Sequence, residues 1–264
     1  MSNTIHFVGY ELKRFLRSIN GYILLLTGTL PIIIMLTFTA QKYVINSLIY
    51  DLTSLKSTIL SGFVFFSYIV IIFFCILLCN YLIVSENAYE WLCVTMSRKH
   101  ILFAKLIVSF VLISILIVEC IVSFILILYS YNIPLVLLED ITSSVFLLYF
   151  LSFFVLSLSV LSNVIAIRVN VPSLANYLVI FLFFVIPFII YFSYFQLGLF
   201  DQQMLDFSLH TPVQNIVFYF LVDTSMIEDL TGVEFQNSVV FILIVSIFSL
   251  ISSFLLFSSS SLDK

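Results

Sequence analysis

The residues best suited to chemistry lie in one polar stretch, SENAYEWLCVTMSRKH, at positions 85–100. Two of its glutamates are four residues apart, so a helix would place both carboxylates on one face. Such a helix could dock on a partner protein. The alternative is a connector whose tryptophan lies at the lipid interface, where tryptophan is common. The candidate docking residues are Glu86, Glu90, Trp91, Leu92 and Arg98.

A second candidate is Glu119, an acidic residue within an otherwise apolar run. It follows Lys105 by 14 residues, which corresponds to about 21 Å along a helix. A carboxyl group at that depth is costly, so it should face protein or a water-filled cavity, or be protonated. One interpretation is a cavity-facing group that contacts cargo. The other is a neutral or hydrogen-bonded carboxyl that joins helices, with a partner such as Ser123.

Signatures of catalysis are missing from the sequence. It contains no GxxxxGK[ST] phosphate loop, no GxSxG and no HExxH motif, and His6, His100 and His210 are scattered. Cys75 and Cys79 are four residues apart, but no histidine or further cysteine is close in sequence. We therefore interpret them as buried apolar residues and expect no disulfide. We expect no catalytic residue, metal or cofactor in this chain.

Composition identifies the environment in which these residues must be positioned. Of the 264 residues, 62% are hydrophobic and 9% are charged. A soluble domain carries about 25% charged residues, so this chain has too little polar surface to face water. No polar stretch is long enough for a soluble catalytic domain. Any energy-using domain should therefore belong to a separate chain.

Six apolar stretches reach the length of about 20 residues that a membrane span needs. The backbone must be hydrogen-bonded internally in lipid, so these spans should be helices. The runs do not alternate polar with apolar residues, which argues against a barrel. We predict an all-α integral membrane fold and one transmembrane domain over 1–264. The predicted spans are 21–40, 59–84, 104–130, 143–167, 173–195 and 237–257, with Pro31 and Pro187 as candidate kinks.

The distribution of Lys and Arg predicts the orientation, because cytoplasmic loops carry the excess of these residues. With both termini in the cytoplasm, the outer side would hold only Lys42 and Lys56. We therefore predict a multi-pass protein of the plasma membrane, with 85–100 inside. The residues on the inner side would be Lys13, Arg14, Arg17, Arg98, Lys99, Lys105, Arg168 and Lys264.

Two further segments flank the predicted spans. Residues 4–18 form an amphipathic pattern suited to an interfacial helix on an anionic leaflet, although a solvated tail is the alternative. Its apolar face would hold Ile5, Val8, Leu12, Phe15 and Leu16, with Lys13, Arg14 and Arg17 pointing away. The segment 196–236 would lie outside. Within it, 210–222 is apolar but too short to span, which indicates a re-entrant or interfacial helix rather than a surface loop.

With these features, the chain resembles the ABC-2 type permeases, the membrane subunits of ATP-driven exporters. The amphipathic first helix, the six spans and the long segment before the last span are similar. The loop before the third span is the most specific match, because that family often has Ser-Arg, two variable residues, Ile-Leu, one residue, Gly and Lys there. This chain departs from the pattern at Ala104, at Ala88-Tyr89 and at Met96. The matching residues are Ser97, Arg98, Ile101, Leu102 and Lys105.

The resemblance implies a dimer, formed with a second copy or a related permease, in which each half pairs with a cytoplasmic ABC ATPase subunit. The stretch 85–100 would be the coupling helix that sits in a cleft of that ATPase. ATP and Mg²⁺ would be bound by the partner and not by this chain. Membrane lipid would surround the dimer, and we expect no nucleic-acid partner.

The cargo can be predicted only by class. The chain has 30 Phe and 14 Tyr, so the walls of a cavity would suit an amphipathic or hydrophobic cargo, such as a peptide toxin, a bacteriocin or a drug. Exporters of phenol-soluble modulins are one such kind. Two other functions stay open at this stage: an ion-coupled carrier or channel, and an intramembrane enzyme.

Overall fold

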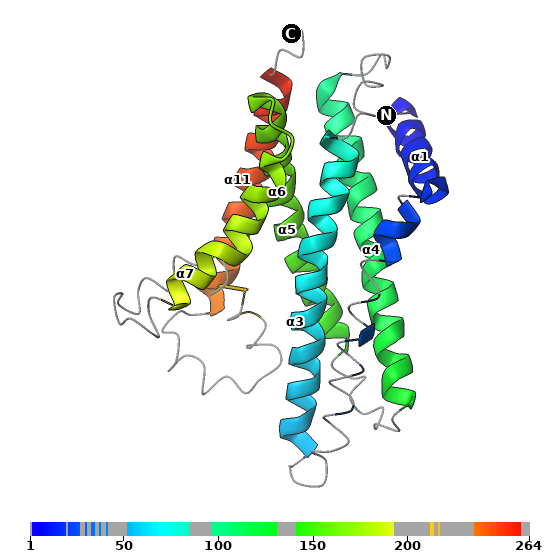
Figure 1. Cartoon of the computed structure of the whole chain (residues 1–264), viewed down its shortest axis with the longest axis vertical. Helices are drawn as coiled ribbons and strands as arrows, with labels where there is room; N and C mark the ends of the chain where they lie inside the picture. Colours follow the sequence, from blue (N-terminus) through cyan, green and yellow to red (C-terminus); the bar gives the residue numbers. More distant parts are fainter. Residues whose placement is uncertain are drawn as a thin grey trace.

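The fold is helical throughout the part of the chain that the computed structural model describes. That part comprises residues 2–19, 21–26, 30, 33–34, 37, 41, 52–84, 97–130, 141–192, 212–213, 216 and 235–259. All regular secondary structure in these ranges is helix, which confirms the predicted all-α class. The elements, drawn in Figure 1, are α1 (Ser2–Arg17), α3 (Leu52–Cys79), η1 (Asn80–Val84), α4 (Arg98–Ser130), α5 (Ile141–Val169), α6 (Leu174–Ile180), η4 (Phe181–Val185), α7 (Ile186–Phe192) and α11 (Phe235–Ser259).

Among the described residues, four helices are long and apolar enough to cross a membrane, so the chain is a membrane-embedded protein. They occupy Gly62–Ile83, Arg98–Ser130, Ile141–Val169 and Gln236–Ser258, where the second, third, fourth and sixth spans were expected. The first predicted span, 21–40 with Pro31, lies largely outside the described residues. The fifth corresponds to the shorter apolar helix Leu174–Ile190. Six spans therefore remain a prediction.

The helix that corresponds to the fifth predicted span changes from α-helical to π-helical hydrogen bonding for one turn near its middle. A π-helical turn, Phe181–Val185, separates α6 from α7. Pro187 follows directly in α7; a proline has no N–H to donate, and its ring clashes with the carbonyl four residues earlier, here that of Phe183. The wide turn contains Phe183, so it lies where a helix would have to accommodate that proline. The structure thus places the irregularity one turn before Pro187.

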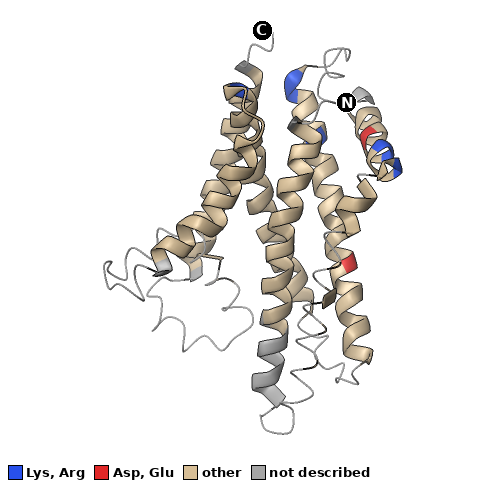
Figure 2. Ribbon diagram, viewed as in Figure 1, with Lys and Arg blue, Asp and Glu red and all other residues tan. Residues whose placement is uncertain are grey.

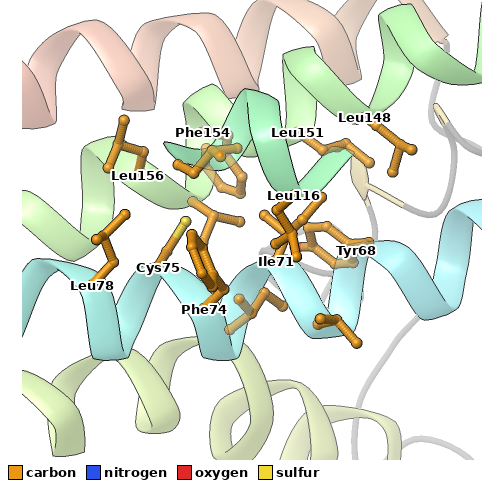
Figure 3. Packing of buried hydrophobic residues seen from close by; sticks show 14 of the residues in the cluster. Tyr68, Ile71, Phe74, Cys75, Leu78, Leu116, Leu148, Leu151, Phe154 and Leu156 are labelled. Carbon is orange, nitrogen blue, oxygen red and sulfur yellow. The ribbon is translucent and has the colours of Figure 1, made fainter. Parts of the chain in front are cut away.

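The hydrophobic core lies between α3, α4 and α5. In Figure 3, side chains of α3 point toward those of α5, and Leu116 of α4 lies beside Ile71. In the most apolar stretch of each helix, 67% of the residues of α3 and of α5 are buried, against 22% of those of α11. The helices α3 and α5 are therefore the central ones. The contributing side chains are Tyr68, Ile71, Phe74, Cys75 and Leu78 of α3, and Leu148, Leu151, Phe154 and Leu156 of α5.

Small polar side chains allow α11 to pack closely along α5. Ser246, Ser249 and Ser253 of α11 are buried. Ser246 donates to the carbonyl of Ile242 at 2.7 Å and Ser253 to that of Ser249 at 2.7 Å, so both hydroxyls are satisfied within their own helix. The opposite face of α11 exposes large apolar side chains and suits contact with lipid.

In the segment 196–236, which is predicted to lie outside, the structure describes residues 212–213 and 216, and residues 235–236 at the start of α11. Residues 212–213 and 216 are helical, and Val213 and Ile216 are buried in the hydrophobic core. These positions fit a segment that returns to the bundle. The re-entrant or interfacial helix at 210–222 stays a prediction because its other residues lie outside the described part.

Candidate functional site

Basic side chains gather at one end of the helix bundle, which we call the basic end. This end holds the start of α4, the end of α5, and α1 alongside (Figure 2). Glu119 is the acidic residue that lies away from it, further along α4. The basic residues concerned are Lys13, Arg14, Arg17, Arg98, Lys99, Lys105 and Arg168.

The helix α1 packs beside the start of α4, and Val8, Leu12 and Phe15 of its predicted apolar face pack on the hydrophobic core. Phe15 and Glu11 are only 1% and 3% exposed, whereas Ile5 is 71% and Leu16 38% exposed. Thr4, seven residues before Glu11, is buried too. The buried face therefore passes through Glu11, and the predicted apolar face is divided between protein contact and the surface. The physical reason is that an acid on α1 meets a base on α4.

That base is Lys105, and the two side chains form a buried ion pair. Lys105 Nζ lies 3.6 Å from Glu11 Oε1, and the side chains are 3% and 4% exposed. Arg14 adds a second positive charge, with a guanidinium nitrogen 4.0 Å from the same carboxylate oxygen. A buried carboxylate is costly unless it is paired. Both cations thus compensate Glu11 where little water can reach it.

Lys105 also holds the end of α3. Its Nζ donates a hydrogen bond of 2.5 Å to the carbonyl oxygen of Leu82, which lies in the π turn η1. The last carbonyl groups of a helix have no partner within the helix, and a cation is favoured there. One ammonium group therefore connects three elements: its own helix α4, the carboxylate of α1 and the backbone of η1.

A second set of contacts ties the end of α1 to η1. Phe15 and Tyr81 meet edge to face with their ring centroids 5.6 Å apart, and Tyr81 donates a long hydrogen bond of 3.4 Å to Ser18 Oγ. Ser18 Oγ in turn donates to the carbonyl of Phe15 and accepts from the N–H of Gly21, both at 2.9 Å. We call this assembly the α1 clamp; its members are Glu11, Phe15, Ser18, Tyr81, Leu82 and Lys105.

Of the predicted docking residues, the structure describes only Arg98. Glu86, Glu90, Trp91 and Leu92 lie outside the described residues, so their prediction stays open. Arg98 is the first residue of α4. Lys105, seven residues later, is at the centre of the α1 clamp.

The other residues of the motif before the third predicted span begin α4 or are buried in the helix bundle. The carbonyl of Ser97 accepts hydrogen bonds from His100 N and Ile101 N, at 2.9 and 3.2 Å, so the helix begins there. Ile101, Leu102 and Ala104 are all buried. The small residue at 104 is fully buried, which is where a larger side chain would separate the helices.

Sequence reasoning missed Glu11, Phe15 and Tyr81 as partners in this site. A signal for Glu11 was available: it is the one acid in a basic helix and lies seven residues after Thr4 and four before Phe15, on one helix face. Nothing local identifies Lys105 as its partner, because the two are far apart in sequence. That pairing requires knowledge of how α1 lies against α4.

Glu119 has no equivalent partner. The side chain is half-buried, and its Oε2 atom is buried without a hydrogen-bond partner. Three cysteines in the described part of the chain are buried and form no disulfide, namely Cys75, Cys79 and Cys120. Within the ranges that the structure covers, no group of three or more His, Cys, Asp or Glu could hold a metal ion.

The α1 clamp can therefore couple the movement of one helix to that of another. Among the described residues, it offers no group of side chains arranged for catalysis. It joins a surface helix, the end of one membrane helix and the start of the next through a single ammonium group. A comparison with models of protein families finds no match to this chain, and a comparison with curated proteins finds none either.

Proposed function

We propose that this chain is the membrane-spanning permease subunit of an ATP-driven exporter of the ABC-2 type. It would form the translocation path as a dimer and couple to a separate ATPase subunit. The observation that supports the proposal most is the α1 clamp. It fixes both elements that flank 85–96: η1 ends at Val84 on one side and α4 starts at Arg98 on the other. A loop that receives force from a partner needs such a firm base.

The charge distribution supports the orientation that this function requires. All of the Lys and Arg side chains that the structure describes lie at the basic end, and an excess of such residues is typical of the cytoplasmic side. Of the described elements on either side of residues 85–96, η1 ends and α4 begins at that end. On this proposal the segment 85–96 faces the cytoplasm of a plasma-membrane protein, where an ATPase could bind it.

The division of labour follows from what the sequence contains. The chain has no phosphate-binding loop, so ATP and Mg²⁺ belong to the partner. The cargo class proposed is amphipathic or hydrophobic, such as a peptide toxin, a bacteriocin or a drug, because the helices are built almost entirely from apolar and aromatic residues.

The test is purification of the chain in mild detergent together with whatever ATPase it carries. The wild type should co-purify with an ABC ATPase. Trp91→Ala should weaken that binding by about 2 kcal/mol, the size typical of an aromatic hot spot. Charge reversal at Glu86 and Glu90 should also weaken binding or coupling, and added salt should reproduce part of that effect because salt screens exposed charges.

The matched control is Trp91→Phe in the same pull-down. If the tryptophan served only as a lipid anchor, Trp91→Phe would be nearly silent and no ATPase would co-purify with any variant. A wild-type preparation without ATPase, whose transport does not depend on one, would overturn the permease proposal.

One observation favours a second candidate, an ion-coupled carrier. Glu119 carries a carboxyl oxygen without a hydrogen-bond partner in a helix long enough to span the membrane, and such groups are typical of proton and ion pathways. Transport driven by a proton gradient in vesicles without ATP, and abolished in Glu119→Gln, would establish that function instead.

A further inference from the structure

We propose that the buried Glu11–Lys105 ion pair makes α1, η1 and the start of α4 one mechanical unit, so that a displacement of segment 85–96 is passed to α1 and on to residues 21–26. The inference rests on the proposed function for the force that moves the segment. It adds the route by which that force would reach the first predicted span. Glu11 and Lys105 are positioning residues in this scheme.

The first step is the burial of the pair. Glu11 and Lys105 are both buried; loss of Glu11 leaves the Lys105 ammonium without its carboxylate, and loss of Lys105 leaves Glu11 with only the longer contact to Arg14 at 4.0 Å. The ammonium group of Lys105 contacts the Glu11 carboxylate at 3.6 Å and the Leu82 carbonyl at 2.5 Å. Moving α4 away from η1 therefore breaks the contact of this ammonium group with Leu82, and moving α4 away from α1 breaks its contact with Glu11, which favours movement of the three elements together.

The second step is the short distance from this ammonium group to both ends of segment 85–96. Leu82 lies three residues before position 85. Lys105 lies seven residues after Arg98, the first residue of α4, which is about 10 Å along the helix. The contacts of the Lys105 ammonium group therefore lie within about two helix turns of both Val84 and Arg98, the helical residues that flank segment 85–96. Little of a movement of that segment should be lost before it reaches α1.

The third step is the stiff junction between α1 and the helical residues 21–26. Ser18 bridges the Phe15 carbonyl and the Gly21 N–H, both at 2.9 Å. A Cβ atom at position 21 would lie 2.1 Å from the Phe15 carbonyl oxygen, so the backbone fits there only with glycine. The edge-to-face contact of Phe15 with Tyr81 holds the same junction against η1. Through Tyr81 and Ser18, η1 is thus connected to residue 21, and on this proposal movement of η1 is passed along these contacts.

A purely membrane-binding α1 would have a different arrangement. Such a helix needs an apolar face in lipid and basic residues at the headgroups. Lys13 and Arg17 are exposed and could serve that purpose, but Glu11 has no use in it. On that reading, replacing Glu11 with an apolar residue would improve the helix. On the present proposal, the same replacement disconnects it.

The first measurement examines the clamp by itself, with spin labels on Gly9→Cys and Lys99→Cys and distances from double electron–electron resonance. Both positions are exposed, and the Cβ at position 9 would meet nothing within 4 Å. Cys93→Ser removes a competing thiol, and Cys75, Cys79 and Cys120 are buried. The wild-type distance distribution should be narrow. It should broaden in Glu11→Gln and Lys105→Met, and stay narrow in Lys105→Arg, which keeps the charge and the donor.

The matched control is Lys13→Gln, which removes an exposed charge from the same helix without touching the clamp. Its distribution should equal that of the wild type. Unlabelled variants are checked with a thiol-reactive dye, because buried cysteines react only when the bundle unfolds. A Glu11→Gln distribution as narrow as that of the wild type, in folded protein, overturns the clamp.

The second measurement tests transmission in the complex with the co-purified ATPase. Labels on Gly9→Cys and Phe248→Cys, the latter exposed on α11, should change their distance when ATP and vanadate trap the ATPase. In Glu11→Gln the ATPase should remain bound and active, while the fraction of molecules that shift falls roughly fivefold or more, a change typical of lost coupling. Lys105→Arg should restore most of the shift.

The outcomes separate the inference from the proposed function. A full shift in Glu11→Gln, or no shift in the wild-type complex, overturns the transmission route while the permease assignment stands. If no ATPase co-purifies with the wild type, the proposed function fails. The Gly9–Lys99 distances then decide whether the clamp itself exists, and a narrow distribution that broadens on loss of Glu11 supports it.

Discussion

Glu119 and Glu11 show how a carboxyl group in an apolar protein depends on what lies beside it. Glu11 is buried but has Lys105 at 3.6 Å and Arg14 at 4.0 Å. Glu119 is half-buried, yet its Oε2 atom is buried without a hydrogen-bond partner. The first arrangement is a structural pairing. The second leaves a hydrogen-bonding group that cargo, water or a proton could satisfy.

This difference gives a prediction for Glu119. Replacement by leucine should raise the stability in detergent by about 1 kcal/mol, because an unsatisfied polar group is removed from a partly buried position. If the carboxyl group contacts cargo, Glu119→Gln should at the same time alter transport while assembly with the ATPase is unchanged. Stability is measured by thermal reactivity of the buried thiols, and transport is measured in vesicles.

Ser114→Ala supplies the control on the same helix. Its hydroxyl is satisfied by the Phe110 carbonyl at 2.8 Å, so its loss should change stability little and leave transport intact. Normal transport by Glu119→Leu would show that the carboxyl group has no part in transport. A loss of stability in that variant would mean that Glu119 has a structural partner.

At the scale of the elements, the contact between α5 and α11 depends on small side chains. Ser246 is fully buried and bonds within its own helix. Ser246→Leu should overpack the contact and destabilise the protein by about 1–3 kcal/mol. Phe248→Leu, two residues on but 69% exposed, should be nearly silent. The thermal reactivity of the buried cysteines reports both variants, and equal melting temperatures would contradict a close α5–α11 contact.

The elements themselves were predictable where hydropathy alone determines them. The long apolar runs at 59–84, 104–130, 143–167 and 237–257 correspond to helices, because a backbone in lipid must form its own hydrogen bonds. Sequence hydropathy carries less information about which face of a helix meets protein. In α1 the pattern groups five apolar residues on one face, of which Phe15 is buried in the core whereas Ile5 and Leu16 are exposed, and the pattern does not indicate that Glu11 is buried.

The α1 clamp was not predicted as a site from the sequence. The start of α4 was singled out through Ser97, Arg98 and Lys105, and the structure places Lys105 at the centre of the α1 clamp. Glu11 and Tyr81 were missed because their roles depend on contacts between segments distant in sequence. The docking residues Glu86, Glu90, Trp91 and Leu92 stay a prediction from spacing alone.

At the scale of the whole molecule, the described basic side chains lie at one end of the apolar helix bundle. Every Lys and Arg whose side chain the structure describes lies at the basic end (Figure 2), together with the start of α4 and the end of α5; the side chain of Lys56, near the start of α3, lies outside the described part. From the positive-inside rule we propose that this end faces the cytoplasm. The proposed coupling to an ATPase requires that assignment, since a reversed protein would present segment 85–96 outside the cell.

The orientation gives the last prediction, tested in a Cys93→Ser background whose remaining thiols, Cys75, Cys79 and Cys120, are buried. A cysteine at Thr231 should react with a membrane-impermeant thiol reagent in intact cells, because 196–236 is predicted to lie outside. Cysteines at Asn87 and at Lys99, which is exposed at the basic end, should react only after permeabilisation.

Gly9→Cys extends the same experiment to α1, since position 9 is exposed and open. It should behave as Lys99→Cys does, because the ion pair between Glu11 and Lys105 holds α1 at the end of the bundle where α4 begins. Labelling of Lys99→Cys and Gly9→Cys in intact cells, with Thr231→Cys protected, would reverse the orientation. A coupling role for segment 85–96 would then be impossible, because no cytoplasmic ATPase could reach it.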